Sequence, residues 1–202
     1  MPDPNVFAEA TWRTELPTLV GRAVTLREPA TQDLAPLVDL LAPGGATRFG
    51  LEEPVSDSSV LQLIARVARD RANGMSVTYA ITLTVTGALV GLLQMRSLDS
   101  AFEAGECECT IEPSTRGSGV FIDAARLAGS FAFTTLCAHR LEARVLLENG
   151  RANGALRKLG AVQEGILRRS VRRGGDYADQ VLWSLLKEDW REHPVSIAGR
   201  VH

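Results

Sequence analysis

The sequence is poor in the residues that build disulfide-linked or metal-centred folds. Of its 202 residues only three are cysteines, at positions 107, 109 and 137. Their number is odd, and no Cys-x-x-Cys or Cys/His ligand spacing occurs, so neither a disulfide framework nor a structural zinc site is indicated. We expect reduced thiols and no metal.

Long apolar runs and an excess of one charge are also missing. No uninterrupted apolar stretch approaches the ~20 residues needed to cross a bilayer, and the first residues lack the basic start of a signal peptide. The formal net charge is -2, with both signs interspersed, which argues against a protein that coats nucleic acid or anionic lipid. We expect a cytoplasmic protein with no membrane partner and no nucleic-acid partner.

Three common signatures of nucleotide binding and hydrolysis are absent. The chain has no Gly-x-x-x-x-Gly-Lys-Ser/Thr loop and no Gly-x-Ser-x-Gly elbow, and Gly117-x-Gly119 lacks the third glycine of a dinucleotide fingerprint. The sequence therefore argues against a P-loop nucleotidase, a dinucleotide-binding dehydrogenase and an α/β-hydrolase.

The length and composition predict one globular domain over residues 1–202, because 45% apolar content can fill a single core at this length. Residues 1–12 and 194–202 have the composition of loosely held termini. Strands and helices interleave, which indicates an α/β (α+β) class with a mixed sheet of about seven strands flanked by helices. The predicted strands are 21–28, 77–84, 89–97, 105–112, 141–147, 162–170 and 177–186. The predicted helices begin at Thr31, after Pro54, at Val120 and at Ala152.

The strand over residues 105–112 has two chemically different faces. Alternation puts Cys107, Cys109 and Ile111 on one face and the residues Glu106, Glu108, Thr110 and Glu112 on the other. We expect the first face to pack on the core and the second to face solvent or a cleft.

The turn that follows this strand carries the strongest functional signal. Arg116-Gly117-Ser118-Gly119 leads into a helix that starts with Val120 and Phe121. Two glycines remove the Cβ atoms that would keep an anion off the main chain, and the first helical turn offers unpaired N–H groups at the positive end of the helix dipole. This arrangement predicts a phosphate site. Taken alone, such a motif is more often an ordinary strand-to-helix turn, by roughly two to one.

The order of these parts resembles the GNAT superfamily of acyl-CoA-dependent N-acyltransferases, and within it the RimJ/RimL-like branch of ribosomal-protein N-terminal acetyltransferases. The matching segments are Leu26-Arg27-Glu28-Pro29 with Asp33, the strand from Glu106 to Pro113, the turn Arg116-Gly117-Ser118-Gly119, Asn149 with Lys158-Leu159-Gly160, and Asp179 with Trp183. The resemblance implies a splayed pair of central strands. It also implies acetyl-CoA as cosubstrate, a peptide N-terminal or small-molecule amine as acceptor, and a chain that can form a homodimer.

The resemblance also assigns roles to individual residues. The main chain of residues 116–121 would hold the pyrophosphate of acetyl-CoA, and the main chain near Thr110 and Ile111 would hold the thioester. Glu106 would be the general base, and a solvated strand carboxylate is the alternative. Asn149 would contact the pantetheine arm, although it could equally cap the helix that follows.

Three residues depart from the family pattern. Phe121 stands where Gly or Ala is usual, Ala152 where many relatives have Ser, and Leu156 where others have a Tyr that can protonate the leaving thiolate. The leaving-group acid is therefore unassigned. These departures keep a second function open, that of a CoA-binding sensor or protein-interaction module that has lost turnover.

Overall fold

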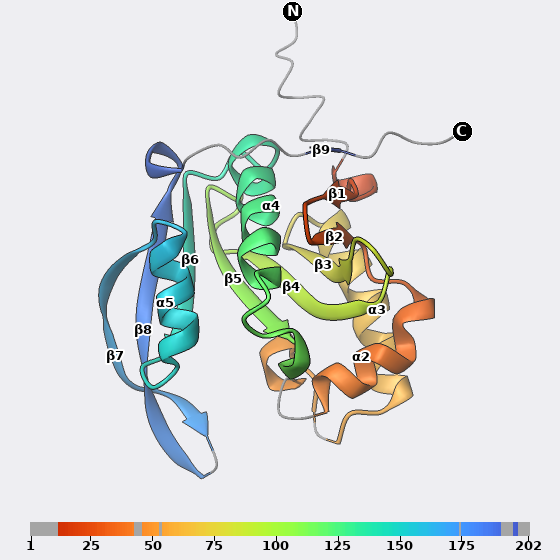
Figure 1. Cartoon of the computed structure of the whole chain (residues 1–202), viewed down its shortest axis with the longest axis horizontal. Coiled ribbons are helices and arrows are strands. Elements are labelled where there is room, and N and C mark those ends of the chain that lie inside the picture. Colours follow the sequence, from red (N-terminus) through yellow and green to blue (C-terminus); the bar gives the residue numbers. More distant parts are fainter. Residues whose placement is uncertain (1–11, 43–45, 53, 174, 191–195, 198–202) are drawn as a thin grey trace, which may run out of the picture.

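The computed structural model describes residues 12–42, 46–52, 54–173, 175–190 and 196–197. They form one open sheet of nine strands with helices on both faces (Figure 1). The strand order is β7-β8-β6-β5-β4-β3-β2-β1-β9. Every neighbouring pair is antiparallel except β5 and β6, which run parallel. The predicted fold class, a mixed sheet flanked by helices, is confirmed.

All seven predicted strands are present, with ends that differ by a few residues. They are β2 (Val24–Arg27), β3 (Ser76–Leu83), β4 (Leu89–Ser97), β5 (Ala104–Ile111), β6 (Arg140–Leu146), β7 (Val162–Arg173) and β8 (Asp176–Leu186). Two strands of two residues each complete the sheet, β1 (Leu19–Val20) and β9 (Ser196–Ile197). A two-residue strand is too short to show alternation, so the sequence gives no sign of either.

The first two helices lie on one face of the sheet. They are α2 (Leu34–Leu41), preceded by the short turn η1 (Thr31–Asp33), and α3 (Asp57–Ala72), with η2 (Ala46–Phe49) between them. Ser56 caps α3, because its hydroxyl accepts a hydrogen bond from Ser59 N. Their apolar stripes meet the sheet at Leu92 in one buried cluster. The sequence Pro43-Gly44-Gly45, which predicts the end of the first helix, lies outside the described residues.

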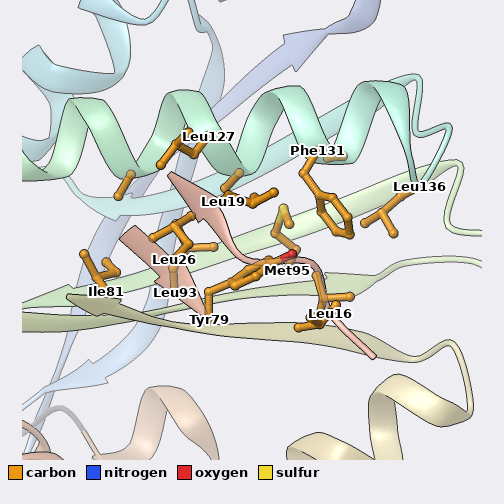
Figure 2. Close-up of a cluster of buried hydrophobic side chains, with 14 of the residues drawn as sticks. Leu16, Leu19, Leu26, Tyr79, Ile81, Leu93, Met95, Leu127, Phe131 and Leu136 are labelled. Carbon is orange, nitrogen blue, oxygen red and sulfur yellow. The ribbon is translucent and has the colours of Figure 1, made fainter. Parts of the chain in front are cut away.

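The opposite face carries α4 (Val120–Thr134), preceded by the turn η3 (Pro113–Thr115), and α5 (Gly150–Lys158). Leu127 and Phe131 of α4 lie above Tyr79, Leu93 and Met95 of the sheet (Figure 2). These side chains belong to the larger core, in which Phe131 meets Tyr79 edge to face with ring centroids 5.7 Å apart. The stripe that anchors this helix on the sheet is therefore formed by residues spaced +4, +3 and +4 along the sequence, namely Val120, Ala124, Leu127 and Phe131.

The two ends of the chain are described only in part. Trp12, at the edge of the segment expected to be loosely held, is buried and meets Phe102 edge to face at 5.9 Å. A short turn, η4 (Lys187–Asp189), follows β8. No helix in the described ranges combines the length and apolar character needed to cross a membrane.

Candidate active site

The turn between β5 and α4 is shaped by its two glycines. Gly117 has φ 92° and Gly119 has φ 88°, in the left-handed region that favours glycine. A Cβ added at either position would meet no atom within 4 Å. The glycines are therefore required by the path of the main chain, and the space above them is open to a ligand.

The start of α4 leaves a group of main-chain N–H groups unused. The intrahelical ladder begins with Asp123 N, which donates to Gly119 O at 3.0 Å. No acceptor in the described part of the chain lies within bonding distance of the N–H groups of Gly117, Gly119, Val120, Phe121 and Ile122. These donors stand at the positive end of a 15-residue helix. Such a set of donors can hold a phosphate or pyrophosphate.

Two contacts fix the position of these donors. Ser118 Oγ donates to Thr115 O at 2.6 Å and closes the turn. Asp123 Oδ2 accepts from Ala23 N at 2.6 Å and from Val24 N at 3.1 Å, which ties the first turn of α4 to the loop before β2. This contact of Asp123 could not be predicted, because its partners lie about 100 residues away along the chain.

Arg116 adds a positive charge beside the turn. Its side chain is exposed, and no hydrogen bond or ion pair joins it to any other residue that the structure describes. A guanidinium in this state can turn toward an anion without first leaving a partner.

The strands β5 and β6 separate next to the turn. Residues 104–106 pair with residues 140–142, and the pairing ends there. Beyond Glu106, β5 stays paired with β4, whereas β6 continues alongside β8 (Figure 1). The predicted splayed pair of central strands is thus present, and the split opens toward the turn before α4.

The register shows which main-chain groups face the split. Glu112 N donates to Val90 O at 2.8 Å, so alternate residues from 112 back to 106 direct their main chain toward β4. Cys109 and Ile111 therefore direct theirs toward the split, where no described strand pairs with them. Of the two residues predicted to bind the thioester, Ile111 directs its main-chain groups toward the split. Thr110 lies beside it with its side chain on the glutamate face.

The core face of β5 is confirmed as the sulfur face. Cys107 and Cys109 pack with Ile111 against the larger core. Burial, with smaller contributions from neighbouring anionic groups, raises the pKa of each thiol to about 12. At neutral pH both sulfurs are protonated and are poor nucleophiles.

The other face of β5 carries Glu106, which is only 7% exposed. Its Oε2 pairs with the Arg96 guanidinium, and its Oε1 lies 3.3 Å from Arg144 Nη1. Arg96 comes from β4 and Arg144 from β6, so the carboxylate links the strands on both sides of β5 at the point of separation. Neither arginine was predicted, because each becomes a neighbour only when the sheet forms.

Asn149 is the N-cap of α5. Its Oδ1 accepts from Ala152 N at 3.1 Å, so the capping alternative is present in the structure. The side chain is exposed, and its Nδ2 has no partner among the described residues. Capping therefore leaves a donor that could still contact a ligand.

Asn153 is a residue that the sequence did not single out. It is 8% exposed, and its Nδ2 donates to Leu146 O at 3.0 Å and to Leu147 O at 3.3 Å. Its Oδ1 accepts from Trp183 Nε1 at 2.8 Å. Leu146 O also accepts from Asn149 N at 2.9 Å. The buried amide thus holds the end of β6 and the Asn149 loop in place. In the sequence, Asn153 looks like any polar residue on a helix, and only its burial in the structure sets it apart.

No group of three or more His, Cys, Asp or Glu side chains in the described ranges is arranged to hold a metal ion.

Comparison with known proteins agrees with this geometry. Residues 23–162 match the family described as Acetyltransferase (GNAT) domain. The chain is 25% identical over 175 residues to a Bacillus subtilis protein named "Putative ribosomal N-acetyltransferase YdaF", covering 85% of this chain and 95% of that one. It is also 25% identical over 171 residues to the spermidine N(1)-acetyltransferase of Escherichia coli, covering 84% and 89%.

A solved structure shares the fold. Mycobacterium smegmatis RimJ in complex with CoA-disulfide superposes with a TM-score of 0.74 at 22% sequence identity, covering 85% of this chain and 88% of that one. The family match spans more than half of the chain. This protein therefore belongs to the GNAT family of acyl-CoA-dependent N-acetyltransferases.

Proposed function

We propose that this protein transfers the acetyl group of acetyl-CoA directly to a primary amine while both substrates are bound. The observation that carries the proposal is the row of five N–H groups between Gly117 and Ile122 for which the described residues provide no acceptor, next to the split between β5 and β6. The pyrophosphate of acetyl-CoA would sit on these donors. The pantetheine arm would then run along the split toward Ile111.

The donor-binding residues follow from this placement. Gly117, Gly119, Val120 and Phe121 supply main-chain donors, Ser118 closes the turn, and Arg116 adds charge. Phe121 contributes its N–H group, which does not depend on the size of its side chain. At the other end of the arm, Ile111 supplies the main chain that faces the thioester, with Thr110 beside it, and Asn149 Nδ2 is free for the pantetheine.

The transfer is direct because the two cysteines nearest the split are unsuited to carry the acetyl group. Their thiols face the core, and their pKa of about 12 keeps them protonated. The Cys107→Ala variant should therefore transfer the acetyl group at a rate within about twofold of the wild-type rate, provided that the fold persists. Loss of transfer in a folded variant would instead show a covalent acetyl-cysteine step.

The acceptor must lose a proton before it can attack. A free α-amine, with a pKa of about 8, reaches the neutral form more readily than a lysine side chain, with a pKa of about 10.4. The glutamate face of β5 supplies carboxylates beside the split, and Glu106 is the one that the sequence predicts. Peptide N-termini and small-molecule amines such as polyamines both fit this requirement. One relative is named a putative ribosomal N-acetyltransferase and another a spermidine N(1)-acetyltransferase.

The test is to follow CoA release from acetyl-CoA with a panel of N-terminal peptides, spermidine and free amino acids, alongside the shift in Tm that CoA produces. We expect CoA to raise Tm and at least one acceptor to release CoA. A Tm shift without CoA release from any acceptor would favour a CoA-binding sensor or interaction module.

A further inference from the structure

Two glutamates on one face of β5 have different surroundings. Glu106 is almost fully buried, and each of its carboxylate oxygens is engaged by an arginine. Glu108 is half-buried, and within the described parts of the chain its carboxylate has neither a hydrogen bond nor an ion pair. One carboxylate is fully committed to protein partners, whereas the other is free to meet a ligand.

Glu108 also has the better position. The parallel pairing of β5 with β6 ends at Glu106 and Glu142, so Glu108 is the first residue on this face beyond the separation. On its other side it lies opposite Gln94 of β4, whose amide donates instead to Thr78 Oγ1 at 3.0 Å. No neighbouring strand therefore satisfies Glu108, and three residues further along the same strand lies Ile111, whose main chain faces the split.

The charges around Glu108 are mixed. Arg48 of η2, Arg144 of β6 and Arg96 of β4 favour its ionised form, whereas burial, the largest influence, and the charge of Glu106 oppose it. The result is a pKa raised above the ordinary value for glutamate. A carboxylate with a raised pKa is a better proton acceptor near neutral pH than an ordinary one. The fixed charge of Glu106 contributes to this shift.

We propose that Glu108 is the catalytic base of this protein and that Glu106, held by Arg96 and Arg144, is a positioning residue beside it. The proposal rests on the acetyl transfer proposed above. It assigns the proton to a residue that neither the family match nor the sequence reasoning selected.

The acetyl transfer removes two protons from the acceptor nitrogen. Glu108 takes one proton from the acceptor ammonium, and the neutral nitrogen attacks the thioester carbonyl. As the N–C bond forms and the C–S bond breaks, the second proton leaves the nitrogen for the departing thiolate, whose ordinary pKa is about 8.5. The products are the amide, CoA thiol and one proton, which Glu108 returns to water. No separate leaving-group acid is required.

The experiment compares the full-length protein with E108Q, E106Q and the control E103Q, which alters an exposed glutamate just before β5. The acceptor is the amine of the panel above that the wild type acetylates fastest. For each protein we would measure kcat/KM between about pH 6 and 9, the Kd for acetyl-CoA, and Tm as a check of folding.

We expect E108Q to lower kcat/KM by about 10²-fold or more below the pKa of the amine, a typical contribution of general base catalysis. The deficit should shrink as the pH rises, because the amine is then neutral without help. The Kd for acetyl-CoA should stay within about twofold. E106Q should lose less activity and move the acidic limb of the pH profile to lower pH, because Glu108 loses a neighbouring negative charge. E103Q should match the wild type.

Two results would overturn the inference while leaving acetyl transfer intact. One is an E108Q variant with unchanged rate and pH profile. The other is an E106Q variant that shows the large, pH-dependent loss expected of E108Q. A wild type that binds acetyl-CoA but acetylates no acceptor would overturn the proposed function, and this inference with it.

Discussion

One half of the candidate site consists of main-chain groups, and the other half consists of side chains. The turn from Arg116 to Ile122 offers main-chain N–H groups that lie close together along the chain. The glutamate face of β5 presents side chains from separate elements, with Arg96 from β4, Glu106 and Glu108 from β5, and Arg144 from β6. A main-chain site depends on local conformation, and a side-chain site depends on what the sheet brings together. Changes in the two halves should therefore have different signatures.

The largest effect on donor binding should come from Gly119→Ala, with Gly87→Ala as the matched control. Both glycines have positive φ and open space around a Cβ, but Gly87 lies in the hairpin between β3 and β4. Each variant should lose about 1–2 kcal/mol of stability from strain at positive φ. Only Gly119→Ala should also weaken the binding of acetyl-CoA. Its Kd should rise by about 10-fold to 100-fold, which corresponds to about 1.5–3 kcal/mol of charge-assisted hydrogen bonding.

Calorimetric Kd values together with denaturant midpoints would separate these two effects. Equal Kd values for acetyl-CoA in both glycine variants would place the pyrophosphate somewhere other than this turn. The acetyl-transfer proposal would then lose the observation on which it depends.

Arg116→Ala should have a smaller effect on the same half. A charge contact near the surface contributes about 1 kcal/mol or less, which is about fivefold in affinity. The loss should appear in the KM for acetyl-CoA, with kcat nearly unchanged, and it should fade as salt is raised. Arg22→Ala, at an exposed arginine before β2, is the control. An unchanged KM with reduced kcat would contradict a role in holding the phosphates.

The contrast between the halves also explains what the sequence could predict. Gly117 and Gly119 are neighbours in the sequence, and the conformation they permit is local, so the turn and the free donors could be predicted together. The faces of β5 followed from alternation alone. The partners of Glu106 could not be predicted, because Arg96 lies 10 residues and Arg144 38 residues away, and only the register of β4, β5 and β6 brings them to it.

The same reasoning applies to the fold. Strands of seven or more residues and helices with an apolar stripe show their period, and they were found within a few residues of their ends. The helix predicted to begin at Ala152 begins at Gly150, because Asn149 caps it. The two-residue strands β1 and β9 were missed. Leu19 of β1 pairs with Leu26 of β2 on one side and with Ile197 of β9 on the other, and β1 and β9 lie at opposite ends of the chain.

Asn153→Ala tests a contact that belongs to neither half alone. It removes the bonds to Leu146 O and Leu147 O, and it takes from the buried indole N–H of Trp183 the acceptor that it has in the structure. We expect a loss of about 1–3 kcal/mol in the free energy of unfolding. We also expect a rise of a few-fold in the KM for acetyl-CoA, since the Asn149 loop loses its support. Asn73→Ala, at the exposed end of α3, is the control. Lost stability with an unchanged KM would make Asn153 purely structural.

The two glutamate variants should also differ in stability, measured as Tm against pH, and E108Q should show the smaller change of the two. E106Q should lower Tm, because a buried carboxylate that holds two arginines is lost, at a cost of about 1–3 kcal/mol. Glu108 has the opposite effect on stability. Its folded pKa lies above the ordinary, unfolded value, so the ionised form opposes folding at neutral pH, and this penalty disappears as the pH falls through the raised value toward the ordinary one.

E108Q should therefore raise Tm at neutral pH by no more than about 2–4 °C, the shift that about 1 kcal/mol produces in a chain of this size. The gain over the wild type should vanish near pH ~4, where Glu108 is protonated in both states. A Tm gain at neutral pH with a loss of turnover would show that this carboxylate is kept at a cost in stability for its chemistry. A Tm that falls in E108Q would show instead that Arg48, Arg96 or Arg144 holds the carboxylate, and the distinction between the two glutamates would disappear.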